Sequence, residues 1–265
     1  MSERHGAGSA AFFDLDKTIL ATSSSLALQG SFLDAGLISR SAAIMSVLVH
    51  LPYLLRGADA DRMDQMARAL GDLAKGIDAR LLESIVEESL ETAIDPVCYV
   101  RALEEIARHR AAGRPVVVAS ASVIEVVRPI AARLGADAVL ASRVATDERG
   151  GYTGEILHYN QSEKKAEACA RLAAERGWDL AESWAYSDSV SDVPLLSSVG
   201  HPVAVNPDRG LRAVAEERGW EIARFDETAR APRRIPAPSR RTLGIAAFAI
   251  GAGALAVGLA VSRRP

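Results

Sequence analysis

The sequence has few cysteines, no visible repeats and no apolar segment at its amino terminus. Its 265 residues include only two cysteines, Cys98 and Cys169, which lie far apart and match no metal-binding spacing. This argues against a disulfide framework or a zinc module, and we expect two buried thiols in a reducing compartment. The histidines also show no ligand spacing. The missing signal-like segment agrees with a cytoplasmic location for the body of the protein.

Acidic residues are absent after position 229. All 34 acidic residues but only 24 of the 31 basic ones lie within residues 1–229, so this part carries a net charge of −10. An acidic body argues against a nucleic-acid partner. Hydrophobic residues at 49% and charged residues at 25% are ordinary for a globular protein of one or two domains.

The carboxyl-terminal tail contains one long uncharged run. Leu243 to Val261 spans 19 residues without charge, and as a helix it would measure about 28 Å, close to the roughly 30 Å hydrocarbon core of a bilayer. We expect a single transmembrane helix at 243–261, although a packed or peripheral helix also fits. The preceding linker, 228–242, holds five arginines and three prolines. Only two arginines follow the span, so the positive-inside rule predicts a membrane anchor with residues 1–242 in the cytoplasm.

The stretch Phe12–Ile19 (FFDLDKTI) is the first chemical signal. An apolar run ends in Asp14 and Asp16, spaced i, i+2, with Thr18 close behind. In an extended chain the two carboxylates point to one face, at the strand end where open α/β sheets bind ligands. Such a pair suits Mg²⁺ and a carboxylate nucleophile in phosphoryl transfer. Taken alone, the pattern also fits an acidic turn or a Ca²⁺ loop.

A second apolar strand, expected at 115–119, leads into Ser120. A hydroxyl at that strand end can donate to a phosphate oxygen, although a plain turn serine also fits. Ser122 is interpreted as a helix N-cap, because Glu125 follows at capping-box spacing.

Two lysines open the helix expected at 163–177. Ser162 can cap this helix, and Lys164 and Lys165 occupy its first turn. A cation at a helix amino end opposes the usual charge preference, which makes sense if it serves a bound anion. The alternative is a solvated surface lysine, and the adjacent pair leaves the assignment open by one position.

The segment at 184–196 again joins a short strand to carboxylates. Asp188 and Asp192 are spaced i, i+4 and would share one side of a helical turn. Asp188 can complete a Mg²⁺ shell, and Asp192 can do the same or anchor a lysine. A solvated helix start also produces this spacing.

Together these segments resemble the haloacid dehalogenase-like hydrolases, in particular their phosphoserine-phosphatase-like branch. The resemblance covers about residues 10–225 and implies an α/β fold, a doubly wound parallel sheet with an inserted helical cap. Its four motifs fall at Asp14–Thr18, Ser120, Lys165, and Asp188 with Asp192.

The resemblance also implies a role for each motif residue. Asp14 would form an aspartyl-phosphate, and Asp16 would act as acid and then as base. Thr18 and Ser120 would position phosphoryl oxygens, and Lys165, preferred over Lys164, would neutralise charge. Mg²⁺ would be held by Asp14, the main-chain carbonyl of Asp16, and Asp188, while Asp192 would support the lysine or a metal-bound water.

The remaining pattern predicts the domain organisation. Strands are expected at 11–15, 115–119, 138–141, 183–187 and 202–205, with helices at 123–134, 163–177 and 209–218 and a hairpin at 143–157. Residues 10–22 and 96–227 would form the core, and 23–95 a cap with helices near 26–36, 40–56, 61–75 and 79–92. Gly135 and Gly177 sit where helices should stop.

Two features of the expected cap concern the identity of the substrate. The phosphoserine phosphatases carry a glutamate where this chain has Ser23, which makes phosphoserine a doubtful substrate. Residues 42–55 are apolar on nearly every side, which fits a buried helix or a surface for lipid.

The expected function is a Mg²⁺-dependent phosphomonoesterase tethered to a membrane, acting on a small ester, with a lipid-like ester as one option. A phosphotransferase and a membrane-anchored binding module with a degenerate site are the alternatives. The sequence leaves the substrate and the oligomeric state open.

Overall fold

The computed structural model describes residues 8–37, 71 and 74–229. The chain divides into two units, residues 1–231 and 232–265, and the described residues all belong to the first. The transmembrane segment predicted at 243–261, most of the 228–242 linker and the apolar cap segment 42–55 lie outside this description. Within the described residues, no helix is both long and apolar enough to cross a bilayer.

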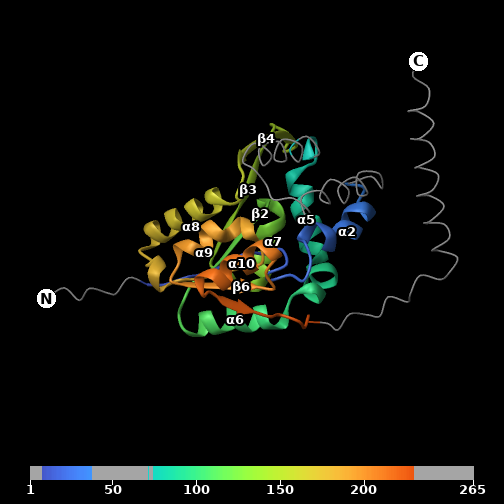
Figure 1. Cartoon of the computed structure of the whole chain (residues 1–265). Helices are drawn as coiled ribbons and strands as arrows, with labels where there is room; N and C mark the ends of the chain where they lie inside the picture. The colour runs from blue at the N-terminus through green and yellow to red at the C-terminus, as the bar shows by residue number, and fades with distance from the viewer. Residues whose placement is uncertain (1–7, 38–70, 72–73, 230–265) are drawn as a thin grey trace, which may run out of the picture. The chain divides into compact units, whose positions relative to one another are not determined.

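The described residues contribute seven strands to one sheet, in the order β4-β3-β2-β1-β5-β6-β7 (Figure 1). Neighbouring strands run parallel except β3 and β4, which form the predicted antiparallel hairpin. The strands are β1 Ala11–Phe13, β2 Val116–Val123, β3 Ala138–Thr146, β4 Tyr152–His158, β5 Trp184–Ser187, β6 His201–Val205 and β7 Glu221–Ala223.

Helices cover both faces of this sheet because strand residues alternate between two apolar clusters. Phe12 and Val117 pack on the side of three helices, α8 Glu163–Arg176, α9 Val193–Ser198 and α10 Arg209–Arg218. Phe13 and Val118 pack on the other side with α5 Ala79–Ser89, α6 Val100–Ala111 and α7 Ile124–Leu134. The predicted doubly wound sheet is confirmed.

The described part of the inserted segment, residues 24–97, is mostly helical. It contains α1 Ser24–Ala27, α2 Gln29–Asp34 and α5, followed by a π-helical turn Leu90–Ile94 and a 3₁₀ turn Asp95–Val97. Phe32 and Ile85 from this segment share one apolar cluster with Phe13 of the sheet. The apolar core is therefore continuous across the expected cap boundary, and the division at 23–95 stays a prediction.

The chain enters the inserted segment near residues 19–21 and returns to the sheet near residues 97–99, and these two stretches are hydrogen-bonded to each other. The Ala21 amide donates to the Val97 carbonyl over 2.7 Å, and the Tyr99 amide donates to the Ile19 carbonyl over 2.9 Å. The end of the described chain joins the same arrangement, because the Ala229 amide donates to the Cys98 carbonyl over 2.8 Å. These two stretches and the end of the described chain, at Ala229, are thus held together at one place.

Several local expectations need correction. Helix α6 and strand β7 were not expected, and β2 and β3 run further than 119 and 141. The N-cap position of α7 is Val123, so the capping-box interpretation of Ser122 is wrong. Ser162 does occupy the N-cap position of α8, but its side chain makes no capping hydrogen bond. Gly135 and Gly177 end their helices in the left-handed conformation, as predicted.

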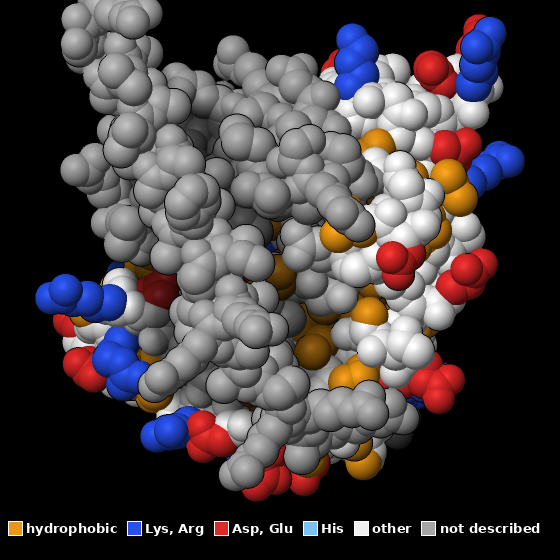
Figure 2. All heavy atoms as spheres, turned by 90° about the vertical axis from the view of Figure 1, so that its right-hand side faces the viewer, with side chains coloured by type: hydrophobic (Ala, Val, Ile, Leu, Met, Phe, Trp, Pro, Cys, Tyr) orange, Lys and Arg blue, Asp and Glu red, His pale blue; other side chains and the backbone are white. Residues whose placement is uncertain are grey.

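Figure 2 shows the face seen from the right-hand side of Figure 1. Among the described residues of this face, acidic and basic side chains are interspersed around the rim. This part of the surface therefore lacks the one-signed basic patch typical of a nucleic-acid interface.

Candidate active site

Three neighbouring strands bring the predicted residues together. Strand β1 lies between β2 and β5, and Asp14, Ser120 and Asp188 come from the carboxyl-terminal parts of β1, β2 and β5 or just beyond them. The chain extends to one side of β1 through β2 and to the other through β5. This is the topological switch point, where open α/β sheets form their binding crevice.

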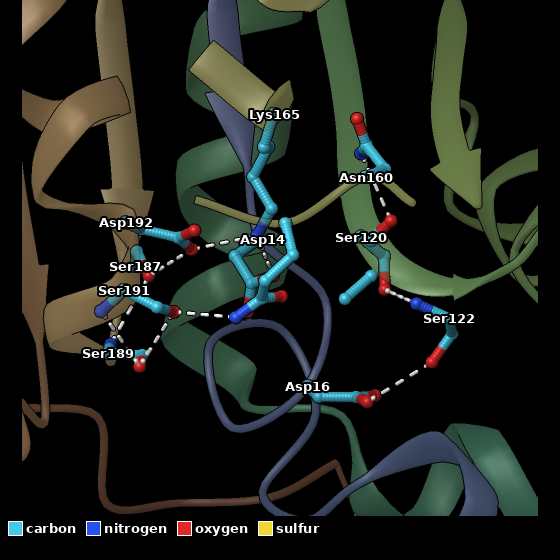
Figure 3. Close-up of polar contacts among 12 residues, drawn as sticks. Asp14, Asp16, Ser120, Ser122, Asn160, Lys165, Ser187, Ser189, Ser191 and Asp192 are labelled. Atoms are coloured by element: carbon cyan, nitrogen blue, oxygen red, sulfur yellow. Dashed lines mark hydrogen bonds and ion pairs between the residues drawn. The ribbon is translucent and has the colours of Figure 1, made fainter. Parts of the chain in front are cut away.

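A buried lysine joins two of the carboxylates (Figure 3). Lys165 Nζ donates to Asp14 Oδ1 over 2.9 Å and to Asp192 Oδ2 over 2.8 Å. The Lys165 side chain is 2% exposed, whereas Lys164 is exposed. Of the two lysines, Lys165 is thus the one that contacts these carboxylates, and Asp192 contacts the lysine. Ser187 holds the same Asp192 oxygen with a hydrogen bond of 2.7 Å.

The site is rich in negative charge. Burial raises the pKa of Asp14 to about 7 against the opposing attraction of Lys165. Desolvation, followed by repulsion from Asp14, raises the pKa of Asp188 to about 8. Burial lowers the pKa of Lys165, but attraction to Asp14 and Asp192 outweighs it and the net shift is upward. The ammonium therefore stays charged among carboxylates that it only partly balances.

Asp16 turns away from this cluster. Its Oδ1 accepts the Ser24 amide over 2.7 Å, and its Oδ2 accepts the Ser122 hydroxyl over 3.4 Å. Figure 3 shows the carboxylate directed toward Ser122, whereas Asp14 faces Lys165. Burial raises the pKa of Asp16, and the hydrogen bonds from Ser24 and Ser122 oppose this shift.

Thr18 is fully buried, and its Oγ1 has no hydrogen-bond partner among the described residues. The neighbouring Lys17 has a φ of 61°, a value that L-residues rarely adopt. Buried hydroxyls are normally satisfied, so Thr18 Oγ1, two residues after Asp16 in the chain, keeps a hydrogen-bonding capacity that a ligand could use.

Ser120 lies where the ladder between β2 and β3 is interrupted. Ala119 pairs with Leu140 and Val123 with Ser142, so β2 has two more residues than β3 between these pairs. This bulge displaces residues 120–122 from the regular ladder. Ser120 is 1% exposed, and its Oγ accepts the Ser122 amide over 3.1 Å.

Two side chains satisfy the carbonyls that the bulge frees. The fully buried Asn160 donates through Nδ2 to the carbonyls of Ser120 and Leu140, each over 3.0 Å. Ser142 Oγ donates to the Ala121 carbonyl over 2.6 Å. Neither Asn160 nor Ser142 was predicted from the sequence.

The metal prediction concerns Asp14, Asp188 and the Asp16 carbonyl. Among the described residues, no group of three or more His, Cys, Asp or Glu side chains is arranged to hold a metal. The predicted set has only two carboxylate side chains, and Mg²⁺ commonly binds through one or two, with water completing its shell. Burial raises the pKa values of both Asp14 and Asp188, and repulsion from Asp14 adds to the shift of Asp188. A divalent cation relieves this electrostatic setting. The donor set therefore fits Mg²⁺.

Comparisons with known proteins agree with this geometry. Residues 11–197 match the model of the haloacid dehalogenase-like hydrolase family. An inhibition of morphological differentiation protein from Streptomyces azureus is 46% identical over 253 residues, which cover 94% of this chain and 91% of the relative. A probable phosphatase of Mycobacterium tuberculosis strain H37Rv is 45% identical over 252 residues, 95% of this chain and 87% of that one.

A solved structure of phosphoserine phosphatase, with an analogue of its phospho-aspartyl intermediate, shares the fold. It superposes with a TM-score of 0.60 at 18% identity, covering 83% of this chain and 94% of that one. At this identity the likeness concerns the fold alone.

The chain belongs to the haloacid dehalogenase-like hydrolase family. Within it the chain is a phosphomonoesterase with phosphoserine-phosphatase-like structural neighbours, which confirms the expectation of an enzyme of this class.

Proposed function

We propose that this phosphomonoesterase transfers the phosphoryl group of its substrate to Asp14 and then to water. Asp14 Oδ1 is held by Lys165, whereas Oδ2 has no hydrogen bond among the described residues and is the attacking oxygen. The bond from phosphorus to the leaving oxygen breaks as the bond to Oδ2 forms, and Asp16 gives its proton to the leaving oxygen. Asp16 then takes a proton from the water that attacks the aspartyl-phosphate. Thr18 and Ser120 donate to phosphoryl oxygens.

The observation that carries this proposal is the position of Lys165. A fully buried ammonium that contacts the nucleophile is anchored by a second carboxylate, Asp192. It lowers the repulsion between Asp14 and an approaching phosphate dianion, and it does so inside a poorly solvated site where charge acts strongly.

Mg²⁺ would be held by Asp14, Asp188 and the Asp16 carbonyl. When bound, it supplies positive charge to the phosphoryl oxygens. The excess of carboxylates over the single buried ammonium supports this part of the proposal.

The substrate we propose is a small phosphomonoester other than phosphoserine. Ser23, where a glutamate would meet an amino group, is the N-cap of α1 and accepts the Leu26 amide. It therefore offers no charge to an ammonium. The uncharged run at 243–261 and the apolar run at 42–55 favour a membrane-tethered enzyme, its body in the cytoplasm, acting on a lipid-like ester.

Phosphate release tests the activity directly. The full-length protein with Mg²⁺ would be assayed on phosphoserine, glycerol phosphates, nucleotides and lysophosphatidate, with Asp14→Asn as the blank. We expect turnover of one ester class that the variant lacks and that a chelator abolishes. Equal activity in Asp14→Asn would contradict the covalent mechanism, and phosphate transfer to an added alcohol would identify a phosphotransferase.

The membrane proposal has its own test. Fractionation of cells expressing the full chain should place it with membranes, and ending the chain after residue 229 should release it. A full chain that stays in the soluble fraction would overturn the tether without affecting the chemistry.

A further inference from the structure

Asp16 is held by two residues to which no catalytic motif assigns a role. Ser24 is fully buried and gives its main-chain amide to Asp16 Oδ1, while Ser122 gives its hydroxyl to Oδ2. The two serine hydroxyls also lie 3.2 Å apart and are hydrogen-bonded to each other. Both oxygens of one carboxylate are thereby fixed, one from the inserted segment and one from the β2 bulge.

The main-chain amide that contacts Asp16 comes from the first residue of a helix. Ser24 is the first residue of α1, where the backbone N–H has no partner inside the helix. The turn at 16–22, where Leu20 pairs with Asp16, brings this amide back onto a carboxylate eight residues earlier. The donor therefore belongs to the entry of the inserted segment, whereas Asp16 follows strand β1.

We propose that Ser24 and Ser122 are positioning residues that hold the Asp16 carboxylate in place for proton transfer. The inference rests on the proposed function, in which Asp16 serves first as acid and then as base. The amide fixes the carboxylate with respect to the inserted segment, and the hydroxyl fixes it with respect to Ser120. A precise orientation matters because proton transfer needs the donor within hydrogen-bond reach of the leaving oxygen.

A matched pair of variants at Ser24 isolates the amide. Ser24→Pro removes the N–H and the hydroxyl, and Ser24→Ala removes only the hydroxyl. Proline is favoured at the first position of a helix. The preceding Ser23 has φ −73° and ψ 144°, the extended conformation that a residue before proline needs. The proline variant should therefore fold, which thermal melting beside Ser24→Ala checks.

The readout is the dependence on the leaving group. An alkyl phosphate needs an acid in the first step, whereas p-nitrophenyl phosphate does not. Relative to Ser24→Ala, we expect Ser24→Pro to lose about ten- to a hundred-fold in kcat on the alkyl ester. On p-nitrophenyl phosphate we expect a smaller loss in the first step and an accumulated phosphoenzyme, because hydrolysis still needs the base.

Variants at Ser122 provide a second test of the inference. Ser122→Ala should show the same pattern as Ser24→Pro, and Ser122→Thr, which keeps a hydroxyl, should recover most of the activity. Equal losses in Ser24→Pro and Ser24→Ala, or equal losses on both substrates in the rate of phosphoenzyme formation, would overturn the inference. A wild-type enzyme that forms no phosphoenzyme on Asp14 would instead overturn the proposed function.

Discussion

The hydroxyl of Thr18 is expected to lower the stability of the fold while it contributes to activity. Its buried Oγ1 lacks a partner among the described residues, and leaving a buried polar atom unpaired costs about 1–3 kcal/mol. Thr18→Val replaces the hydroxyl with a methyl of similar size. We expect the melting temperature to hold or rise while kcat/KM falls about ten-fold or more, as measured by calorimetry and phosphate release. A variant with full activity would show that Thr18 does not meet the phosphoryl group.

The lysine pair gives a second prediction at this scale. Lys165→Met leaves Asp14 and Asp192 buried without their cation, which is expected to cost about 3–5 kcal/mol and to abolish turnover. Lys164→Met is the matched control, since Lys164 is exposed. Denaturant unfolding and activity would be measured on both. Comparable effects at the two positions would contradict the assignment of Lys165.

Residue types and their spacing in the sequence predicted most of the residues that the structure brings together at this edge of the sheet. Carboxylates and hydroxyls at strand ends could be read as one cluster because parallel strands deliver their carboxyl ends to the same edge. Ser122 was misassigned because its spacing to Glu125 satisfies a local helix rule, while the β2 bulge that decides its direction depends on pairing with β3. The Ser24 contact depends on a main-chain amide, which no residue pattern reveals.

At the scale of elements, the bulge in β2 depends on Asn160. Its side chain satisfies two carbonyls on adjacent strands, so Asn160→Ala leaves both buried and unpaired. We expect a loss of about 2–3 kcal/mol in the free energy of unfolding, together with lower activity through Ser120. Denaturant unfolding measures the first effect and phosphate release the second.

His158 supplies the control for this prediction. It contacts Asn160 Oδ1 over 3.2 Å, but it does not touch the two carbonyl contacts of Nδ2. His158→Ala should therefore cost less than Asn160→Ala. The reverse order would show that the amide does not support the bulge.

Some helices and strands were predicted from the sequence more accurately than others. Strands buried on both faces read as apolar runs, which is why β1, β2, β5 and β6 were found within a few residues. Helix α6 was missed, and its charged sequence, VRALEEIARHRA, buries only a narrow stripe that includes Ala102, Ile106 and His109. Strand β7 lies at the edge and has three residues, two of them exposed, so it gave no apolar signal.

At the scale of the whole molecule, a buried histidine links stability to pH. His109 is fully buried behind β1 and β5, where Arg114 donates to its Nδ1 over 2.9 Å and Tyr186 Oη lies 2.8 Å from Nε2. Desolvation lowers the pKa of His109 from 6.5 to about 4, and Arg108 and Arg114 act in the same direction while Glu105 opposes them. In the unfolded chain the imidazole takes up a proton near pH 6.5.

The unfolded state therefore binds more protons than the native state between about pH 6.5 and 4. The contribution of His109 is present above this range and is lost as the pH falls through it. Denaturant unfolding of wild type and His109→Gln across this range would measure the difference. We expect the two curves to converge toward pH 4. Parallel curves for wild type and His109→Gln would contradict this account.

In the proposed mechanism, Asp14 carries the phosphoryl group. The most direct measurement is rapid acid quenching of the full-length enzyme during turnover of a phosphate-labelled substrate, followed by mapping of the labelled peptide. We expect label on the peptide containing Asp14 in wild type, more of it in Asp16→Asn with p-nitrophenyl phosphate, and none in Asp14→Asn. Turnover without label on that peptide, or label that persists in Asp14→Asn, would contradict it.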